Sequence, residues 1–242
     1  MEVHAHSHTE RKKWTHYFWE FLMLFLAVFC GFLAEYQLEH TIEKQKGTDY
    51  IKSMIEDLQN DTAKLNKLTG SLIRINKSVD TIILYFTDIG TGTNPVLLRN
   101  LKAINGFPTF FYSDRTIQQL KNSGGMRLVK DKKAADGIME YDAVIRNYEN
   151  NATYVQRYWE GLTALRLNII DRQSLDNLIS NSTDSKAESE YLITNDPIAL
   201  RKFKNLIYEL RFYHKNTIRD NTRLIEKATG LMEVLRSQYH LQ

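Results

Sequence analysis

The sequence is poor in the residues that interrupt or cross-link a chain. Its 242 residues include three prolines, eleven glycines and one cysteine. A single cysteine excludes an intramolecular disulfide, so cysteine usage does not indicate a redox compartment. The shortage of proline and glycine, with leucine, isoleucine, lysine, asparagine and glutamate abundant, favours long helices over many short strands.

The sequence also lacks a large net charge and lacks motifs for catalysis. The 32 lysines and arginines nearly balance the 29 aspartates and glutamates and are dispersed along the chain, so we expect no nucleic-acid partner. The sequence has no nucleophile motif, and Gly90-Thr-Gly92 lacks the third glycine of a nucleotide loop and follows a helical pattern. We therefore expect neither an enzyme nor a cofactor.

The most distinct positive feature of the sequence is a hydrophobic run near the N-terminus. Residues 21–34 carry no charge, and aromatic residues flank the run on both sides, as at two membrane interfaces: Trp14, Tyr17, Phe18 and Trp19 before it and Tyr36 after it. A helix from Thr15 to Glu35 measures roughly 31 Å, enough to cross a hydrocarbon core of about 30 Å. We predict a transmembrane helix over residues 14–36.

Two kinds of processing are alternatives to an uncleaved anchor. Signal-peptidase cleavage after Ala34 would require a small residue where Phe32 stands. Lipid attachment at Cys30 would likewise require a small residue in place of Phe29. Both misfits favour a retained transmembrane helix.

The flanking charges predict the orientation of this helix. Residues 11–13 are all basic, whereas the other side opens with Glu35, Glu39 and Glu43. Because lysine and arginine are retained in the cytoplasm, we expect residues 1–13 to be a cytoplasmic tail. Residues 37–47 would then be a juxtamembrane linker, with Gly47 as a hinge, and residues 48–242 an extracytoplasmic domain.

One face of the membrane helix combines small and acidic residues. Glu20, Leu24, Ala27, Gly31 and Glu35 follow one another at spacings of three and four, which places them on one side. The small residues Ala27 and Gly31 would let two helices approach closely in lipid. Glutamates near the interfaces can hydrogen-bond across chains. The alternative is that the glutamates only reach the headgroups and that the small residues are incidental.

The N-terminal tail contains His4, His6 and His8 at alternate positions. Neutral imidazoles ligate Zn, Ni or Cu, so these residues are a candidate metal site. A terminal tail supplies no neighbouring groups to orient the rings, which favours a solvated tail without metal.

Apolar residues then repeat every seven positions, which predicts a helix of about 40 residues with a seam facing neighbouring helices. Asp61 is the sole interruption. The two seam positions are Ile51, Leu58, Leu65, Leu72, Val79 and Phe86, and Met54, Leu68, Ile75 and Ile82.

The rest of the chain predicts further helices. Short ones are expected at 96–103 and after Ser113, with the aromatic segment 107–112 non-helical at Pro108 and packed under the bundle end. Long ones are expected over 138–169 and from Asn195-Asp-Pro197 onward, where a cap precedes a proline. Together these elements predict an all-α protein: a transmembrane helix followed by an elongated antiparallel bundle of three long helices and short connecting helices.

The stripe of the last helix is polar in its middle, at His214, Thr217 and Asn221. Polar residues at seam positions more often fix helix register than bind ligands, so we favour a structural layer over a small-molecule site.

Two segments, residues 10–40 and 114–145, resemble uncharacterised membrane-anchored proteins of Bacteroidota. These proteins combine an N-terminal membrane helix with a helical domain that contains a T-x-x-x-L-x-x-S-G-x-x-R-L-I type motif. The resemblance implies a Gram-negative inner membrane and carries no activity. The matching residues here are Thr116, Leu120, Ser123, Gly124, Arg127, Leu128 and Val129, with an additional Gly125.

These patterns favour a structural or interaction subunit of an envelope or membrane complex. Its expected partners are the lipid bilayer and either further copies of the chain or other membrane proteins. The alternative is a periplasmic bundle that senses a small ligand. An inside tail of about thirteen residues is too short for the output module that a sensor needs.

Overall fold

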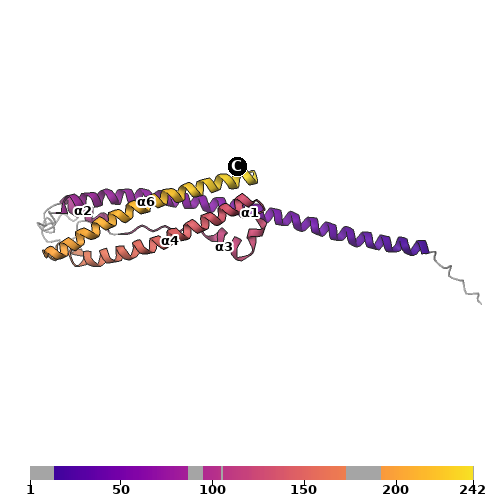
Figure 1. Cartoon of the computed structure of the whole chain (residues 1–242), viewed down its shortest axis with the longest axis horizontal. Helices are drawn as coiled ribbons and strands as arrows, with labels where there is room; N and C mark the ends of the chain where they lie inside the picture. Colours follow the sequence, from indigo (N-terminus) through magenta and orange to yellow (C-terminus); the bar gives the residue numbers. More distant parts are fainter. Residues whose placement is uncertain (1–13, 87–94, 105, 173–191, 242) are drawn as a thin grey trace, which may run out of the picture. The chain divides into compact units, whose positions relative to one another are not determined.

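The computed structural model describes residues 14–86, 95–104, 106–172 and 192–241 (Figure 1). These residues contain no β-strand, only one isolated bridge between Ile170 and Leu192. They form five α-helices and one 3-10 helix, which confirms the all-α prediction. The helices are α1 (Trp14–Leu84), α2 (Pro95–Ala103), α3 (Arg115–Asn122), η2 (Gly125–Leu128), α4 (Lys132–Leu167) and α6 (Pro197–Tyr239).

The chain divides into two compact units, residues 1–49 and residues 50–242. Residues 37–47, predicted as a linker, are helical and belong to α1, so one helix replaces the two that were expected. The helix continues through Gly47 because a single glycine in a helix interior costs only about 1 kcal/mol relative to alanine. No proline lies between Trp14 and Leu84 to interrupt the hydrogen bonds of the helix.

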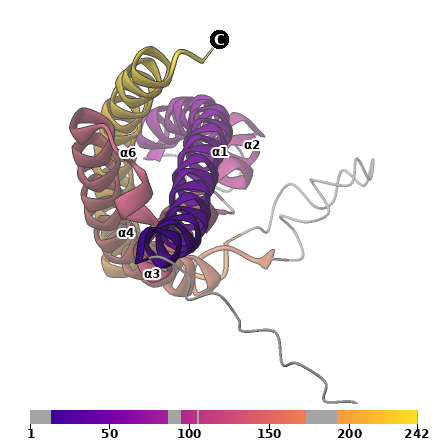
Figure 2. The same ribbon diagram turned by 90° about the vertical axis from the view of Figure 1, so that its right-hand side faces the viewer.

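Within the second unit, the α1 residues from Tyr50 onward pack with α4 and α6 (Figures 1 and 2). α6 runs antiparallel to both partners, as predicted, whereas α1 and α4 run in the same direction. The core shows this order, because Ile51 and Leu58 share a cluster with Ile138, and Val79 shares another with Leu162. The chain returns between α1 and α4 through residues 106–131, so α4 starts at the same end as this part of α1.

The bundle has two apolar clusters, one toward each end. One cluster lies around Leu58, Ile138 and Leu231, and the other around Ile82, Leu162 and Phe203. All six residues of the first predicted α1 seam position are buried. α4 and α6 approach each other most closely, and a Cβ built on Gly137 would come within 2.8 Å of Leu231.

The segment 106–114 is non-helical, as Pro108 predicted, but it runs along the bundle rather than under its end. The ring of Phe107 stacks on that of His214, with centroids 6.0 Å apart. The ring of Phe110 meets Tyr148 edge-on at 5.7 Å. Because these contacts fall in the middle of α4 and α6, the segment covers the interface of the long helices.

Candidate functional site

The first candidate site is the apolar part of α1. This is the one helix, among the described residues, that is long and apolar enough to cross a membrane. None of its apolar window is buried against other parts of the chain. Large side chains such as Phe21, Phe25 and Phe32 are more than half exposed. Apolar side chains at this density need a solvent other than water or a partner surface.

Two different faces can be distinguished on this helix. The rings of Phe21, Phe25 and Phe29 stack in a row, with centroids 6.2 and 5.9 Å apart. The predicted association face lies on another side, because its residues are offset in the helical repeat. A Cβ built on Gly31 would meet no atom within 4 Å, so the backbone at Ala27 and Gly31 is open to close approach.

Of the two glutamates on that face, Glu20 has a partner within its own helix. Its carboxylate lies 3.1 Å from Nε2 of His16, one turn earlier. This ion pair forms when the imidazole is protonated, and it shields the carboxylate from an apolar solvent. Glu35 is exposed. The pairing of Glu20 reduces its freedom to bond to a second helix.

The second candidate site is the polar middle of the bundle. Asn221 is completely buried, and its amide donates to Oγ1 of Thr69 at 3.0 Å. The hydroxyl of Tyr148 donates to Oδ1 of the same asparagine at 2.8 Å. One side chain of α6 is thus bonded to both α1 and α4, which fixes the register of three helices.

Two helical turns before Asn221 on α6, His214 forms a second polar contact. Its Nδ1 lies 3.1 Å from Oδ1 of Asn76 on α1. Burial lowers the pKa of His214 to about 4, so the ring is neutral at neutral pH. Since Oδ1 of an amide only accepts, Nδ1 carries the proton and donates to Asn76. The third predicted member, Thr217, is half-buried and instead donates to the carbonyl of Tyr213 within its own helix.

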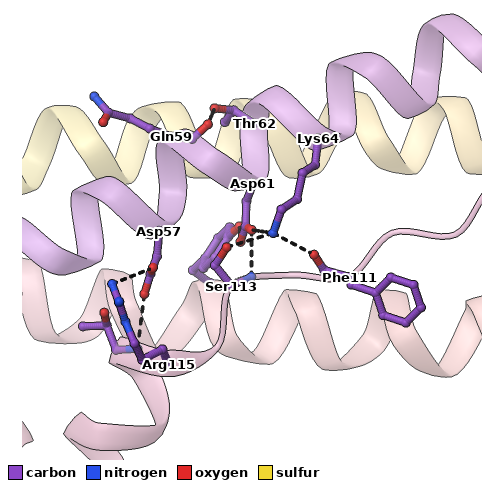
Figure 3. A network of polar contacts seen from close by, with 10 residues as sticks. Asp57, Gln59, Asp61, Thr62, Lys64, Phe111, Ser113 and Arg115 are labelled. Carbon is purple, nitrogen blue, oxygen red and sulfur yellow. Dashed lines mark hydrogen bonds and ion pairs between the residues drawn. The ribbon is translucent and has the colours of Figure 1, made fainter.

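A third polar site involves Asp61, the exception in the α1 seam (Figure 3). This residue is 1% exposed, and its carboxylate accepts from the backbone N–H of Ser113 at 2.8 Å and from the hydroxyl of Tyr141 at 3.2 Å. Burial raises the pKa of Asp61, while the bonds from Ser113, the charge of Lys64 and the Tyr141 bond act in the opposite direction. Lys64 also donates to the carbonyl of Phe111 at 3.1 Å.

One turn earlier on α1, Asp57 caps the start of α3 (Figure 3). Its Oδ2 accepts from the backbone N–H of Thr116 at 3.2 Å, and its Oδ1 lies 3.5 Å from Arg115. The local N-cap residue, Asp114, makes no side-chain cap bond. A carboxylate from a distant helix therefore satisfies a backbone donor that usually has a local partner. Together, Asp57 and Asp61 attach the return segment to α1.

The motif that carries the family resemblance runs through α3, the turn after it and η2. Gly124 has a φ of 67°, a left-handed conformation that favours glycine. A Cβ on Gly125 would come within 3.2 Å of the Leu120 backbone. Leu128 and Val129, next along the chain, are buried. Gly125, Leu128 and Val129 therefore have a packing role in this chain.

Asp142 is the third buried carboxylate, and it joins α3 to α4. It is 1% exposed, and its Oδ2 lies 3.0 Å from Nζ of Lys121 and 3.0 Å from the guanidinium of Arg146. Sequence reasoning did not single out Asp57, Asp61 or Asp142 as site residues. The position of Asp61 in an otherwise apolar repeat was the available signal.

The candidate metal ligands His4, His6 and His8 lie outside the described residues. Among the residues that the structure describes, no group of three His, Cys, Asp or Glu side chains could hold a metal ion. Comparisons with protein-family models, curated proteins and solved structures find no match to this chain.

We predict that the double variant Ala27→Leu, Gly31→Leu forms smaller oligomers in lipid bilayers. The added side chains would hold two helices apart at the face where the backbone is now open. Oligomer size is measured by cross-linking or mass analysis in native lipid. The matched control is Phe25→Leu, which changes the other face. An unchanged oligomer in the double variant would exclude this face from self-association.

We also predict that His214 makes stability depend on pH. Its pKa is lower in the folded chain, about 4, than the ordinary 6.5, so the folded state binds fewer protons between these values. Stability is therefore lost as pH falls from 6.5 toward 4, by roughly 3 kcal/mol at about 1.4 kcal/mol per unit. In His214→Gln this loss should disappear.

The free energy of unfolding of the unaltered chain and of His214→Gln is measured with denaturant across this pH range. The difference between the two values is then followed as a function of pH. Thr217→Ala is the control, because it removes a neighbouring side chain on α6 that does not titrate. The free energy of unfolding of Thr217→Ala should differ from that of the unaltered chain by the same amount at every pH. If the difference for His214→Gln is also constant with pH, His214 is not the source of the pH dependence.

Proposed function

We propose that this chain is a single-pass bacterial inner-membrane protein whose helical bundle acts as a structural or interaction subunit of a membrane or envelope complex. The observation that carries the proposal is the apolar window of α1, of which no residue is buried. A helix of the same composition in a soluble core would be covered by the rest of its own chain. Lipid is the solvent that suits an exposed surface of this kind.

Sequence features support the finer placement. The basic residues 11–13 and the acidic residues after the apolar run favour a cytoplasmic N-terminus and a periplasmic bundle. The resemblance to Bacteroidota proteins agrees with an inner membrane. The open backbone at Ala27 and Gly31 supports association of the anchor with another helix, from a second copy or a partner.

The construction of the bundle suits a scaffold. Buried polar bonds at His214 and Asn221 connect α6 to α1, and the bond to Tyr148 adds α4. Such contacts favour one register, because any slip would leave buried donors and acceptors unpaired. A bundle with a fixed register presents its outer side chains in fixed positions, which is what binding to other proteins requires.

The orientation is tested with reporters fused after Gln242. We expect an alkaline phosphatase fusion to be active and a fluorescent protein that folds only in the cytoplasm to be dark, with the chain in the membrane fraction. Changing residues 11–13 to glutamate in a matched control should reduce this bias, since basic residues determine orientation. Cytoplasmic reporter activity, or recovery of the intact chain without detergent, would overturn the placement.

The interaction role is tested by purification from native membranes. We expect other membrane or envelope proteins to co-elute in fixed stoichiometry with the full chain. An unrelated single-pass protein with the same tag is the control for non-specific recovery. Isolation of this chain alone, as a homogeneous small oligomer, would contradict a subunit role in a larger complex.

A further inference from the structure

A cleft of about 370 Å³ lies between α4 and α6, beside the polar middle of the bundle. Tyr148 and Tyr154 line it from α4, and Tyr213 lines it from α6. Its volume is at the low end of the range of about 300–1,000 Å³ for small-molecule sites. The cleft is contained entirely within the second compact unit.

Two of these rings are held in place by other side chains. The hydroxyl of Tyr148 is bonded to Asn221, and its ring meets Phe110 edge-on. The ring of Tyr213 lies 4.9 Å from that of Tyr158. Because these contacts within the bundle fix the two rings, the aromatic walls need little reordering when a ligand binds, which reduces the entropic cost of binding.

Polar groups without partners face the same cleft. Asn151 from α4 and Asn216 from α6 line it, and neither side-chain amide has a hydrogen-bond partner among the described residues. Each amide offers two donors and one acceptor. Two planar amides from opposite helices can therefore both donate to and accept from the hydroxyl groups of one small molecule.

The charges at the cleft cancel each other. Among the described residues that line it, Arg219 and Asp220 alone are charged, and Nε of Arg219 lies 3.5 Å from Oδ1 of Asp220. Because these two opposite charges lie side by side, they leave the cleft without net charge, which favours a ligand without net charge. The aromatic rings and the amides of Asn151 and Asn216 define what else the ligand must offer.

We propose that this cleft binds a neutral hydroxylated ring compound of the size of a monosaccharide or disaccharide. The apolar C–H face of such a ring packs on Tyr148 and Tyr213, and its hydroxyls bond to Asn151 and Asn216. The ligand can be a free sugar or the end of a longer glycan, since the recognition chemistry is the same. This inference goes beyond the scaffold role and does not depend on the orientation in the membrane.

The test uses the full chain in lipid nanodiscs, with glycoside detergents excluded because their headgroups are sugars. Glucose, N-acetylglucosamine, cellobiose and chitobiose are titrated by calorimetry up to tens of millimolar. Chitotetraose is added to distinguish a glycan end from a free sugar, because only a glycan site should bind it more tightly than chitobiose. We expect at least one of these saccharides to bind with a dissociation constant in the millimolar range or below.

Variants then locate the binding. Tyr213→Ala should weaken affinity roughly three- to tenfold, from the loss of ring packing. Asn151→Ala should also weaken it, and this variant should fold, because Asn151 is exposed and its side chain has no hydrogen-bond partner in the part of the chain that the structure describes. Tyr208→Ala is the control, since this half-exposed tyrosine of α6 does not line the cleft. Binding of no saccharide, or binding that Asn151→Ala and Tyr213→Ala leave unchanged, would overturn the proposal.

Discussion

Asn221 connects three helices in the middle of the bundle, and much of the remaining structure depends on that connection. Its amide bonds to Thr69 and Tyr148, so a shift of α6 by one turn would leave a fully buried amide unpaired. The penalty for such a loss is about 1–3 kcal/mol, a large part of the stability of an ordinary domain. The same bond holds Tyr148 at the wall of the cleft, so the register and the shape of the cleft have one common cause.

Two carboxylates of α1 have an equivalent role for the return segment. Asp57 and Asp61 bond to the backbone near Thr116 and Ser113, which positions α3 beside α1. This attachment lets the chain come back along the bundle before α4 begins, and α4 consequently runs parallel to α1. The apolar clusters at both ends supply most of the hydrophobic stabilisation, whereas the polar contacts select one arrangement of the helices.

The sequence predicted the core well where the repeat was regular. The seam of α1 is buried as expected except at Ile75, which is partly buried, and the last helix starts at an N-cap, Asp196, followed by proline. The sequence did not predict the direction of each long helix, because that depends on where the chain reverses between helices. The parallel course of α4 could not be read from helical periodicity, because a stripe of apolar residues has no preferred direction. Thr217 has the spacing of the polar layer, yet its hydroxyl bonds to its own helix.

By itself, the sequence determined that the chain is helical, that its first helix has an apolar surface, and which side of each later helix is buried. Composition and period specify these properties, since they depend on residues close together in the chain. Only the tertiary structure decided which helices are neighbours, that Asp57 caps a distant helix, and that the tyrosines and amides of α4 and α6 meet at one cleft. Such properties arise from contacts between residues far apart in sequence, whose pairing depends on the packing of the whole bundle.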